Sequence, residues 1–339
     1  MSDARPLPLL DRRLLFVTGK GGTGKTTVAA ALAQLAADRG KRVLACEVDA
    51  KGDLAALFEA GPTDFTGREV ASGVVVMSMD TEESLREYLK LYLRIPVVGG
   101  LGPLARALDF VAAAAPGVRE ILTVGKLCHE VRERNFDLVV VDAAATGHIV
   151  GQLAAPQAIN DLVKVGLIRS QTDWMLEILS DPRRTGLVAV TTPEEMPVNE
   201  TLELAARIRA ETTVQLCAVV VNRVLPELFG LHEEEVFDRV YAHAEQLSKL
   251  LGGDADPLMQ GARLAVTLRR TRAGHLRRLR RGLGSEVAAA ESGAAATGGG
   301  AGAVSAAPQV LYVPYLFSRA HGLRSMRQVA QSLGEELGL

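Results

Sequence analysis

The sequence predicts an α/β protein with a doubly wound, mostly parallel sheet, and two observations predict it. Short continuous apolar runs alternate with helical stretches along the chain, which is how strands covered on both faces of a parallel sheet are patterned. A glycine-rich segment at 19–27 lies between the first apolar run and the first helical stretch. Sheets of this kind bind their ligands at that position, beyond the carboxyl end of a strand.

The glycine-rich segment reads Gly-Lys-Gly-Gly-Thr-Gly-Lys-Thr-Thr and matches the phosphate-binding pattern G-x-x-x-x-G-K-[ST]. Backbone N–H groups in such a loop converge on phosphate oxygens at the start of a helix. Lys25 is expected to reach the β- and γ-phosphates, and the Thr26 hydroxyl to bind Mg²⁺. Lys20 is an additional lysine at the second position, so the fold class is a P-loop NTPase with a deviant Walker A motif. The predicted phosphate-binding residues are Gly19, Gly21, Gly22, Thr23, Gly24, Lys25, Thr26 and Thr27.

The predicted elements follow one another in a single P-loop domain over 13–339. Leu14–Val17 is the strand before the motif, and the helix after it runs from Val28 to a glycine stop at Gly40. Apolar side chains recur at helix spacing from 81 to 134, so this segment is interpreted as a helical insertion. A largely helical stretch precedes the segment 285–308, whose alanine, glycine and serine predict a flexible loop. The other predicted strands are 42–48, 73–79, 138–142, 186–191, 217–222 and 310–314, and the closing helix is 322–337.

Composition narrows the class of protein. The chain has 339 residues, 48% of them hydrophobic, which supplies a sizeable core. A formal net charge of −2 gives no global attraction to nucleic acid, so a nucleic-acid partner would need a local basic patch. Cys46, Cys128 and Cys217 form no C-x-x-C pair, which favours a reducing cytoplasm over a disulfide framework. Neither a signal peptide nor an integral membrane segment is predicted.

An arginine cluster between 269 and 281 is the one strongly basic stretch. Two interpretations stand for it. A solvated helix face is the plainer one, because the apolar stripe beside the arginines is thin. An acidic partner or a membrane surface is the other.

Aspartates at strand ends supply the acidic groups that phosphoryl transfer needs near Mg²⁺ and the attacking water. Asp142 closes the apolar strand 138–142 and is expected to support the metal. Asp49 ends the second strand and could hold water in line with the γ-phosphate. Asp53, four residues later, is the alternative for the same task.

These residues resemble the arsenite-pump ATPase family, which includes the tail-anchored-protein targeting ATPases. The resemblance rests on Lys20 with Lys25, and on Asp142-Ala-Ala-Ala-Thr-Gly-His148, where the family has D-T-A-P-T-G-H. Asn222 at a strand end and Val313-Pro314 also resemble the family pattern. The resemblance to the family extends from about residue 13 to the C-terminus. The single P-loop is most similar to the single-domain, actinobacterial-type branch.

The resemblance implies an ATP-hydrolysing switch that uses ATP and Mg²⁺. Lys20 would reach the phosphates of a partner across a nucleotide-sandwich dimer, and Asp49 would position water in switch I. Residues 146–148 would be the switch II loop. Asn222 would recognise adenine, with Pro314 nearby in the base pocket.

Three departures from the family pattern shape the functional hypotheses. Switch I reads Asp49-Ala50-Lys51-Gly52 where the family has D-P-A-H, the zinc-binding cysteine pair of the targeting branch is absent, and the cysteines do not predict a three-thiolate arsenite site. The leading hypothesis is a cytoplasmic ATPase whose dimer opens and closes to drive a client protein or membrane partner. A positioning ATPase of the MinD/ParA kind, bound to a surface or nucleic acid, is the first alternative. A weakly hydrolysing subunit in a heterodimer with a paralogue is the second, so the dimer is homo- or heteromeric.

Overall fold

The computed structural model describes residues 7–49, 51–92, 117–163, 165–227, 230–296, 307–317 and 322–339. Residues 93–116 of the predicted insertion and 297–306 of the predicted loop therefore lie outside the described residues. So does Ala50, within the switch I sequence.

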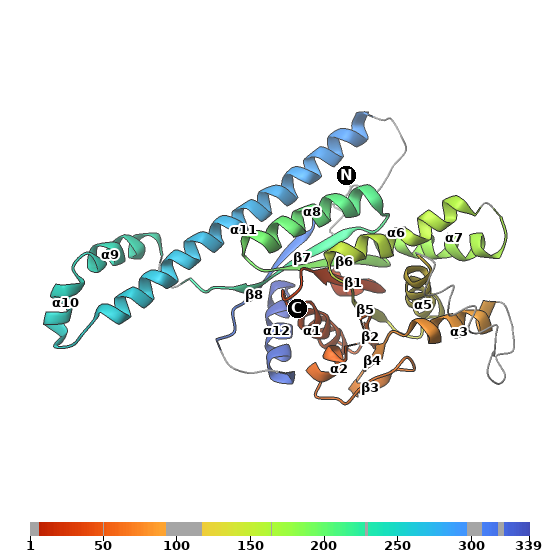
Figure 1. Cartoon of the computed structure of the whole chain (residues 1–339), viewed down its shortest axis with the longest axis horizontal. Coiled ribbons are helices and arrows are strands. Elements are labelled where there is room, and N and C mark those ends of the chain that lie inside the picture. Colours follow the sequence, from red (N-terminus) through yellow and green to blue (C-terminus); the bar gives the residue numbers. More distant parts are fainter. Residues whose placement is uncertain are drawn as a thin grey trace.

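An eight-stranded sheet organises the chain, with strand order β3-β4-β2-β5-β1-β6-β7-β8 (Figure 1). Neighbouring strands are parallel except for the edge pair β3 and β4, which is antiparallel. The predicted fold class is confirmed, and each predicted strand is present within a few residues of its expected bounds. The strands are β1 Leu14–Gly19, β2 Val43–Glu47, β3 Arg68–Ala71, β4 Val74–Ser78, β5 Leu138–Asp142, β6 Thr185–Thr191, β7 Leu216–Val224 and β8 Gln309–Pro314.

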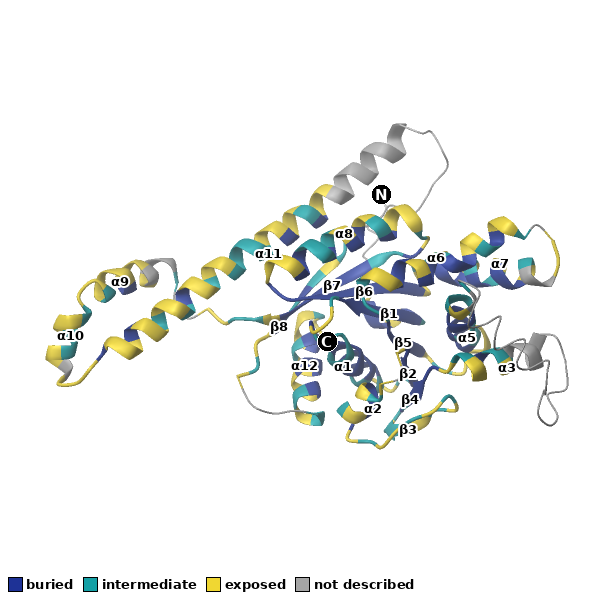
Figure 2. Ribbon diagram, viewed as in Figure 1, coloured by how far each residue is buried: buried dark blue, intermediate teal, exposed yellow. Residues whose placement is uncertain are grey.

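Helices cover both faces of the sheet, and the central strands are coloured as buried in Figure 2. Helices α1, α2 and α12 contribute to the core on one face. Helices α5, α6, α7, α8 and α11 contribute to the core on the other. The helices are α1 Lys25–Ala37, α2 Asp53–Leu57, α3 Thr81–Tyr92, α5 Val118–Glu133, α6 Thr146–Leu162, α7 Leu167–Ser180, α8 Glu195–Glu211, α9 Leu231–Tyr241, α10 Ala244–Leu251, α11 Asp256–Ala296 and α12 Leu323–Glu336, with a short 3₁₀ turn at Leu9–Asp11.

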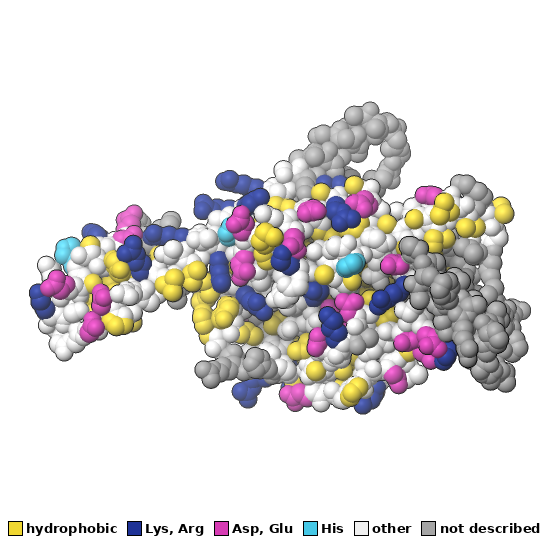
Figure 3. Space-filling view, in the orientation of Figure 1, with side chains coloured by type: hydrophobic (Ala, Val, Ile, Leu, Met, Phe, Trp, Pro, Cys, Tyr) yellow, Lys and Arg dark blue, Asp and Glu magenta, His cyan; other side chains and the backbone are white. Residues whose placement is uncertain are grey.

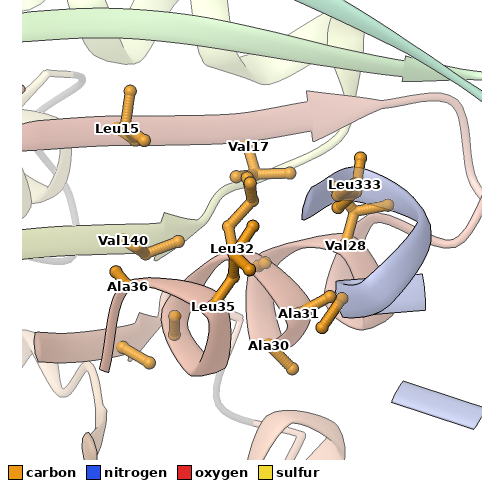
Figure 4. Close-up of a cluster of buried hydrophobic side chains, with 14 of the residues drawn as sticks. Leu15, Val17, Val28, Ala30, Ala31, Leu32, Leu35, Ala36, Val140 and Leu333 are labelled. Carbon is orange, nitrogen blue, oxygen red and sulfur yellow. The ribbon is translucent and has the colours of Figure 1, made fainter. Parts of the chain in front are cut away.

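The side chains of strand β1 enter the core on both faces of the sheet, which explains why its sequence is continuously apolar. Leu15 and Val17 point into the α1 side of the core, while Leu14 and Phe16 point to the opposite side. Successive side chains of a strand alternate between faces, so a central strand needs apolar residues at every position. Figure 4 shows Leu15 and Val17 above Leu32 of α1, with the small side chains of α1 allowing close approach to the sheet.

The two ends of the predicted helical insertion, α3 and α5, are helical and lie together. Lys126 of α5 joins them, because its ammonium lies 2.8 Å from Glu87 of α3 and 2.7 Å from Glu130 of its own helix. Lys126 is largely buried, so both carboxylates are needed to compensate its charge.

Helices α9, α10 and the first half of α11 form an arm that extends away from the sheet (Figure 1). The arm has its own small core, built from Phe237, Met259 and Val266. Helix α11 then returns to pack against α8 and continues to Ala296. Residues 285–296, predicted as part of a flexible loop, are therefore helical. Their alanine content explains this, since alanine has the highest helix propensity.

Most arginines of the 269–281 cluster have partners within the chain. Arg269 donates to the Leu225 carbonyl (3.2 Å) and Arg280 to the Tyr312 hydroxyl (2.6 Å). Arg270 pairs with Asp238 and Arg272 with Glu194. Arg277, Arg278 and Arg281 are exposed, and Figure 3 shows several basic side chains along this helix mixed with acidic ones. Much of the cluster therefore fastens α11 to its neighbours. Among the described residues, no helix is both long enough and apolar enough to cross a membrane.

Candidate active site

The carboxyl ends of the parallel strands bring the predicted site residues to one edge of the sheet. Strand order reverses at β1, which is flanked by β5 and β6. In such sheets a crevice forms beyond the carboxyl ends where the order reverses. Gly19 ends β1, Asp142 ends β5, Glu47 ends β2 and Asn222 lies near the end of β7. Residues separated by as many as 199 positions, such as Thr23 and Asn222, are consequently in contact.

The glycine-rich loop follows β1 directly and ends in helix α1. Gly19 lies so close to β6 that a Cβ there would be 2.1 Å from the Val190 carbonyl oxygen. Backbone cannot yield to such a contact, so only glycine fits. The loop is closed internally by the buried Thr23, whose hydroxyl donates to the Lys20 carbonyl at 2.9 Å.

Asn222 holds the loop from the other side. Its amide nitrogen donates to the Thr23 carbonyl at 2.8 Å, and its amide oxygen accepts from the Arg223 N–H at 2.9 Å. Gly24 has φ of 95° and no room for a side chain, because a Cβ would lie 2.5 Å from the Asn222 amide. Asn222 is buried at 8% exposure. The nitrogen and the oxygen of the Asn222 side-chain amide thus both have partners within the chain. In this structure the side chain supports the glycine-rich loop.

The start of α1 is an anion-binding position. Its N-cap, Gly24, supplies no side-chain hydrogen bond, so the first backbone N–H groups of the helix are open to a ligand. Lys25 begins the helix, with its ammonium 3.5 Å from the Lys20 carbonyl, and a Cβ built on Gly21 or Gly22 meets no heavy atom within 4 Å. Uncapped N–H groups, an adjacent cation and open space together fit a phosphate group.

Asp142 is the buried carboxylate of the site. Burial raises its pKa from the ordinary value to about 6, opposed by a hydrogen bond from Thr26 and by the charge of Lys25, with Glu47 and Asp49 raising it further. Asp142 is 8% exposed and its Oδ1 has no hydrogen-bond partner among the described residues. A buried carboxylate with an unpaired oxygen beside a threonine hydroxyl fits a hard divalent cation such as Mg²⁺.

Glu47 is a residue of the site that the sequence did not predict. It is 3% exposed and lies opposite Asp142 in the β2–β5 register. Its carboxylate accepts the N–H groups of Gly52 (2.9 Å) and Asp53 (3.0 Å), so it caps α2 and closes the loop that carries Asp49. The available signal was a carboxylate inside the apolar run 43–48.

The two aspartates that compete for the water-positioning role are in different places. Asp49 is exposed and near enough to Asp142 to raise its pKa. Asp53 begins α2, with its backbone N–H tied to Glu47. Pro314 ends β8 beside Val224 and is exposed, on the edge that carries Asn222.

Lys20 does not point into its own phosphate loop. Its ammonium forms an ion pair with Glu200 of α8, and the other oxygen of Glu200 accepts from the Thr146 hydroxyl at 3.4 Å. Thr146, Gly147 and His148 form the first turn of α6 and not a loop. The Thr18 hydroxyl donates to the Ala144 carbonyl at 2.7 Å, which ties the preceding segment to β1.

The three cysteines are free and buried, and they do not converge. Cys46 and Cys128 lie in one face of the core and Cys217 in the other. Burial raises the pKa of all three thiols, for Cys217 to about 11. Such thiols are inert core residues, and within the described part of the chain no cluster of His, Cys, Asp and Glu forms a metal site.

Comparison with known proteins gives the family. The family model described as anion-transporting ATPase matches residues 12–176 and 165–239. ATPase BagA of Mycobacterium tuberculosis is 34% identical over 232 residues, which cover 65% of this chain and 68% of that protein. The arsenical pump-driving ATPase of Acidiphilium multivorum is 30% identical over 246 residues, 65% of this chain and 40% of that protein.

ATPase ASNA1 homolog 1 of Paramecium tetraurelia is 25% identical over 255 residues, which cover 62% of this chain and 74% of that protein. The family model spans the P-loop, Asp142, Glu200 and Asn222. The chain belongs to the anion-transporting ATPase family and is an ATPase built on a deviant P-loop.

Proposed function

We propose that this ATPase is a nucleotide-driven dimeric switch, in which two chains close around Mg²⁺-ATP and hydrolysis reopens them. The observation that carries the proposal is the different direction of the two loop lysines. Lys25 lies over its own loop, whereas Lys20 points away from it to the partly exposed Glu200. A lysine directed outward from the loop is placed to reach the phosphates of a second chain.

The residues of the site divide the work between them. The loop 19–27 and the N-terminus of α1 bind the phosphates, and Lys25 neutralises charge that develops on them. Thr26 and Asp142 would hold Mg²⁺, which would offset the negative charge of the phosphates. Asp49 orients the attacking water from a loop whose position Glu47 sets. Asn222 supports the loop and, with Pro314, faces the adenine.

We place the contact with a partner or client at the described helices of the predicted insertion, α3 and α5. The described helices α3 and α5 are tied together by Lys126, so they can move as one body when the switch changes state. We place the enzyme in the cytoplasm, because its three cysteines are free and buried, as is usual in a reducing compartment.

Asparagine substitutions test which aspartate positions water. Asp49→Asn is expected to lower ATP turnover by about 100-fold, the usual scale for removing one transition-state contact, with little change in KM. Asp53→Asn is the matched control and should retain turnover, since Asp53 uses its backbone N–H and not its carboxylate toward the site. Steady-state phosphate release measures both. Equal loss in the two variants would contradict the assignment of Asp49.

Native mass spectrometry tests the dimer. Adding Mg²⁺ and a slowly hydrolysed ATP analogue is expected to convert the wild-type chain from monomer to dimer with two nucleotides. Lys20→Ala should raise the dissociation constant of that dimer by at least about tenfold, because one charge-assisted contact to phosphate is lost from each chain. Lys249→Ala, an exposed lysine of α10, is the control. A chain that stays monomeric at saturating analogue would overturn the homodimer and favour a paralogue as partner.

A further inference from the structure

Glu200 joins two parts of the site that are far apart in sequence. One carboxylate oxygen forms the ion pair with Lys20, 180 residues earlier in the chain. The other accepts from Thr146, 54 residues earlier, at the first turn of α6. The glycine-rich loop and the start of α6 thus share one side chain of α8.

The ion pair between Lys20 and Glu200 is of a kind that can open readily. The Lys20 and Glu200 side chains are 32% and 29% exposed, and partly exposed ion pairs contribute only modestly to stability. On the side of Glu200, a groove of about 330 Å³ is lined by Thr146, Gly147, Glu200, Glu203, Leu204 and Arg207. Because both side chains are partly exposed, the pair can open when a stronger anion competes for the lysine.

The phosphates of a bound nucleotide can compete with the Glu200 carboxylate for the Lys20 ammonium. A lysine that reached the phosphates of a second chain while still paired with Glu200 would carry a carboxylate toward those phosphates, and like charges at close range are unfavourable. The pair must open before Lys20 can work in a second active site. When the ion pair opens, the Glu200 carboxylate beside Thr146 is no longer balanced by the charge of Lys20.

We propose that Glu200 is a positioning residue that keeps Lys20 on its own chain until a nucleotide-loaded second chain draws it away, and that it couples this release to the Thr146 turn of α6. The inference rests on the proposed function, since it assigns Lys20 to the second active site. Glu200 acts through Lys20 and does not itself touch the phosphates. Dimer closure and movement of the α6 turn are then one event.

Glu200→Gln tests the inference through the dependence of ATP turnover on protein concentration. Wild-type turnover per chain should rise with concentration as dimers form. Glu200→Gln removes the charge that holds Lys20, so the concentration for half-maximal turnover is expected to fall about three- to five-fold, while turnover converges with wild type at high concentration. Glu203→Gln, one turn along α8 in the same groove, is the control and should follow the wild-type curve.

A double-mutant cycle separates this role from a merely structural one. In the Lys20→Ala background the Glu200→Gln substitution is expected to have no further effect, because the residue it releases is absent. Additive effects would mean that Glu200 acts independently of Lys20 and would overturn the inference, as would a Glu200→Gln curve equal to wild type or shifted to higher concentration. Glu200→Ala serves as a second variant, expected to shift in the same direction, if the glutamine variant does not fold.

The outcomes also distinguish this inference from the proposed function. If wild-type turnover per chain is independent of concentration and Lys20→Ala retains it, the dimeric switch itself is wrong. If Lys20→Ala loses turnover and the concentration dependence holds, but Glu200→Gln matches wild type, only the positioning role of Glu200 fails.

Discussion

Lys25→Ala is expected to lower ATP turnover by at least about 100-fold without unfolding the protein. Positioned cations and donors that stabilise charge developing on transferred phosphate contribute on this scale. Lys25 begins α1 and its ammonium rests near the Lys20 carbonyl. Since its contacts within the chain are few, removing the side chain leaves the core untouched.

Two measurements make this prediction specific. Phosphate release gives the turnover, and a melting curve without nucleotide should stay close to that of the wild type. Lys249→Ala removes a lysine that is 73% exposed on α10 and should turn over ATP normally. If Lys25→Ala keeps most of the wild-type turnover, the loop 19–27 is not the catalytic phosphate site.

Asp142→Asn is expected to make the nucleotide-free protein more stable while lowering turnover by about 100-fold. The folded protein raises the pKa of Asp142 to about 6 through burial, so the folded state binds a proton between about pH 4 and 6 that the unfolded state has lost. Wild-type stability therefore falls as pH rises through this range. Above it, the cost of the buried charge is about 2–3 kcal/mol.

Denaturant unfolding at several pH values, with a chelator present, measures the effect. Because asparagine does not ionise, the variant should exceed wild type in free energy of unfolding by about 2–3 kcal/mol at pH 7, and the difference should vanish near pH 4. Saturating Mg²⁺ should narrow the gap at pH 7, since a bound cation offsets the charge of Asp142 only in the wild type.

Asp137→Asn, at the opposite end of β5 and exposed, is the matched control and should show no such pH-dependent gain. A less stable Asp142→Asn variant at pH 7 would mean that the carboxylate is already compensated in the free protein. That result would argue against Asp142 as a carboxylate that holds Mg²⁺.

The strands could be predicted because their pattern is local. Runs such as 138–141 and 217–221 are apolar at every position, as a strand buried on both faces requires. Strand β3 was missed because Arg68–Ala71 is an edge strand with exposed or half-exposed side chains, so burial leaves no mark on its sequence. The helix at 285–296 was missed because glycine and serine among its alanines indicate a loop, whereas α11 enters this segment already formed and propagates through it.

The sequence by itself determined the class of chemistry expected of this protein, because a glycine loop with two lysines, a threonine and a strand-end aspartate predicts phosphate and Mg²⁺ binding where strand, loop and helix follow one another. Tertiary structure alone decided which residues surround that loop. Asn222 supports Thr23 and Glu200 holds Lys20, and neither contact has a local sequence pattern. The physical reason is that a parallel sheet gathers the ends of strands distant along the chain, so the partners of a loop are set by strand order and not by proximity in sequence.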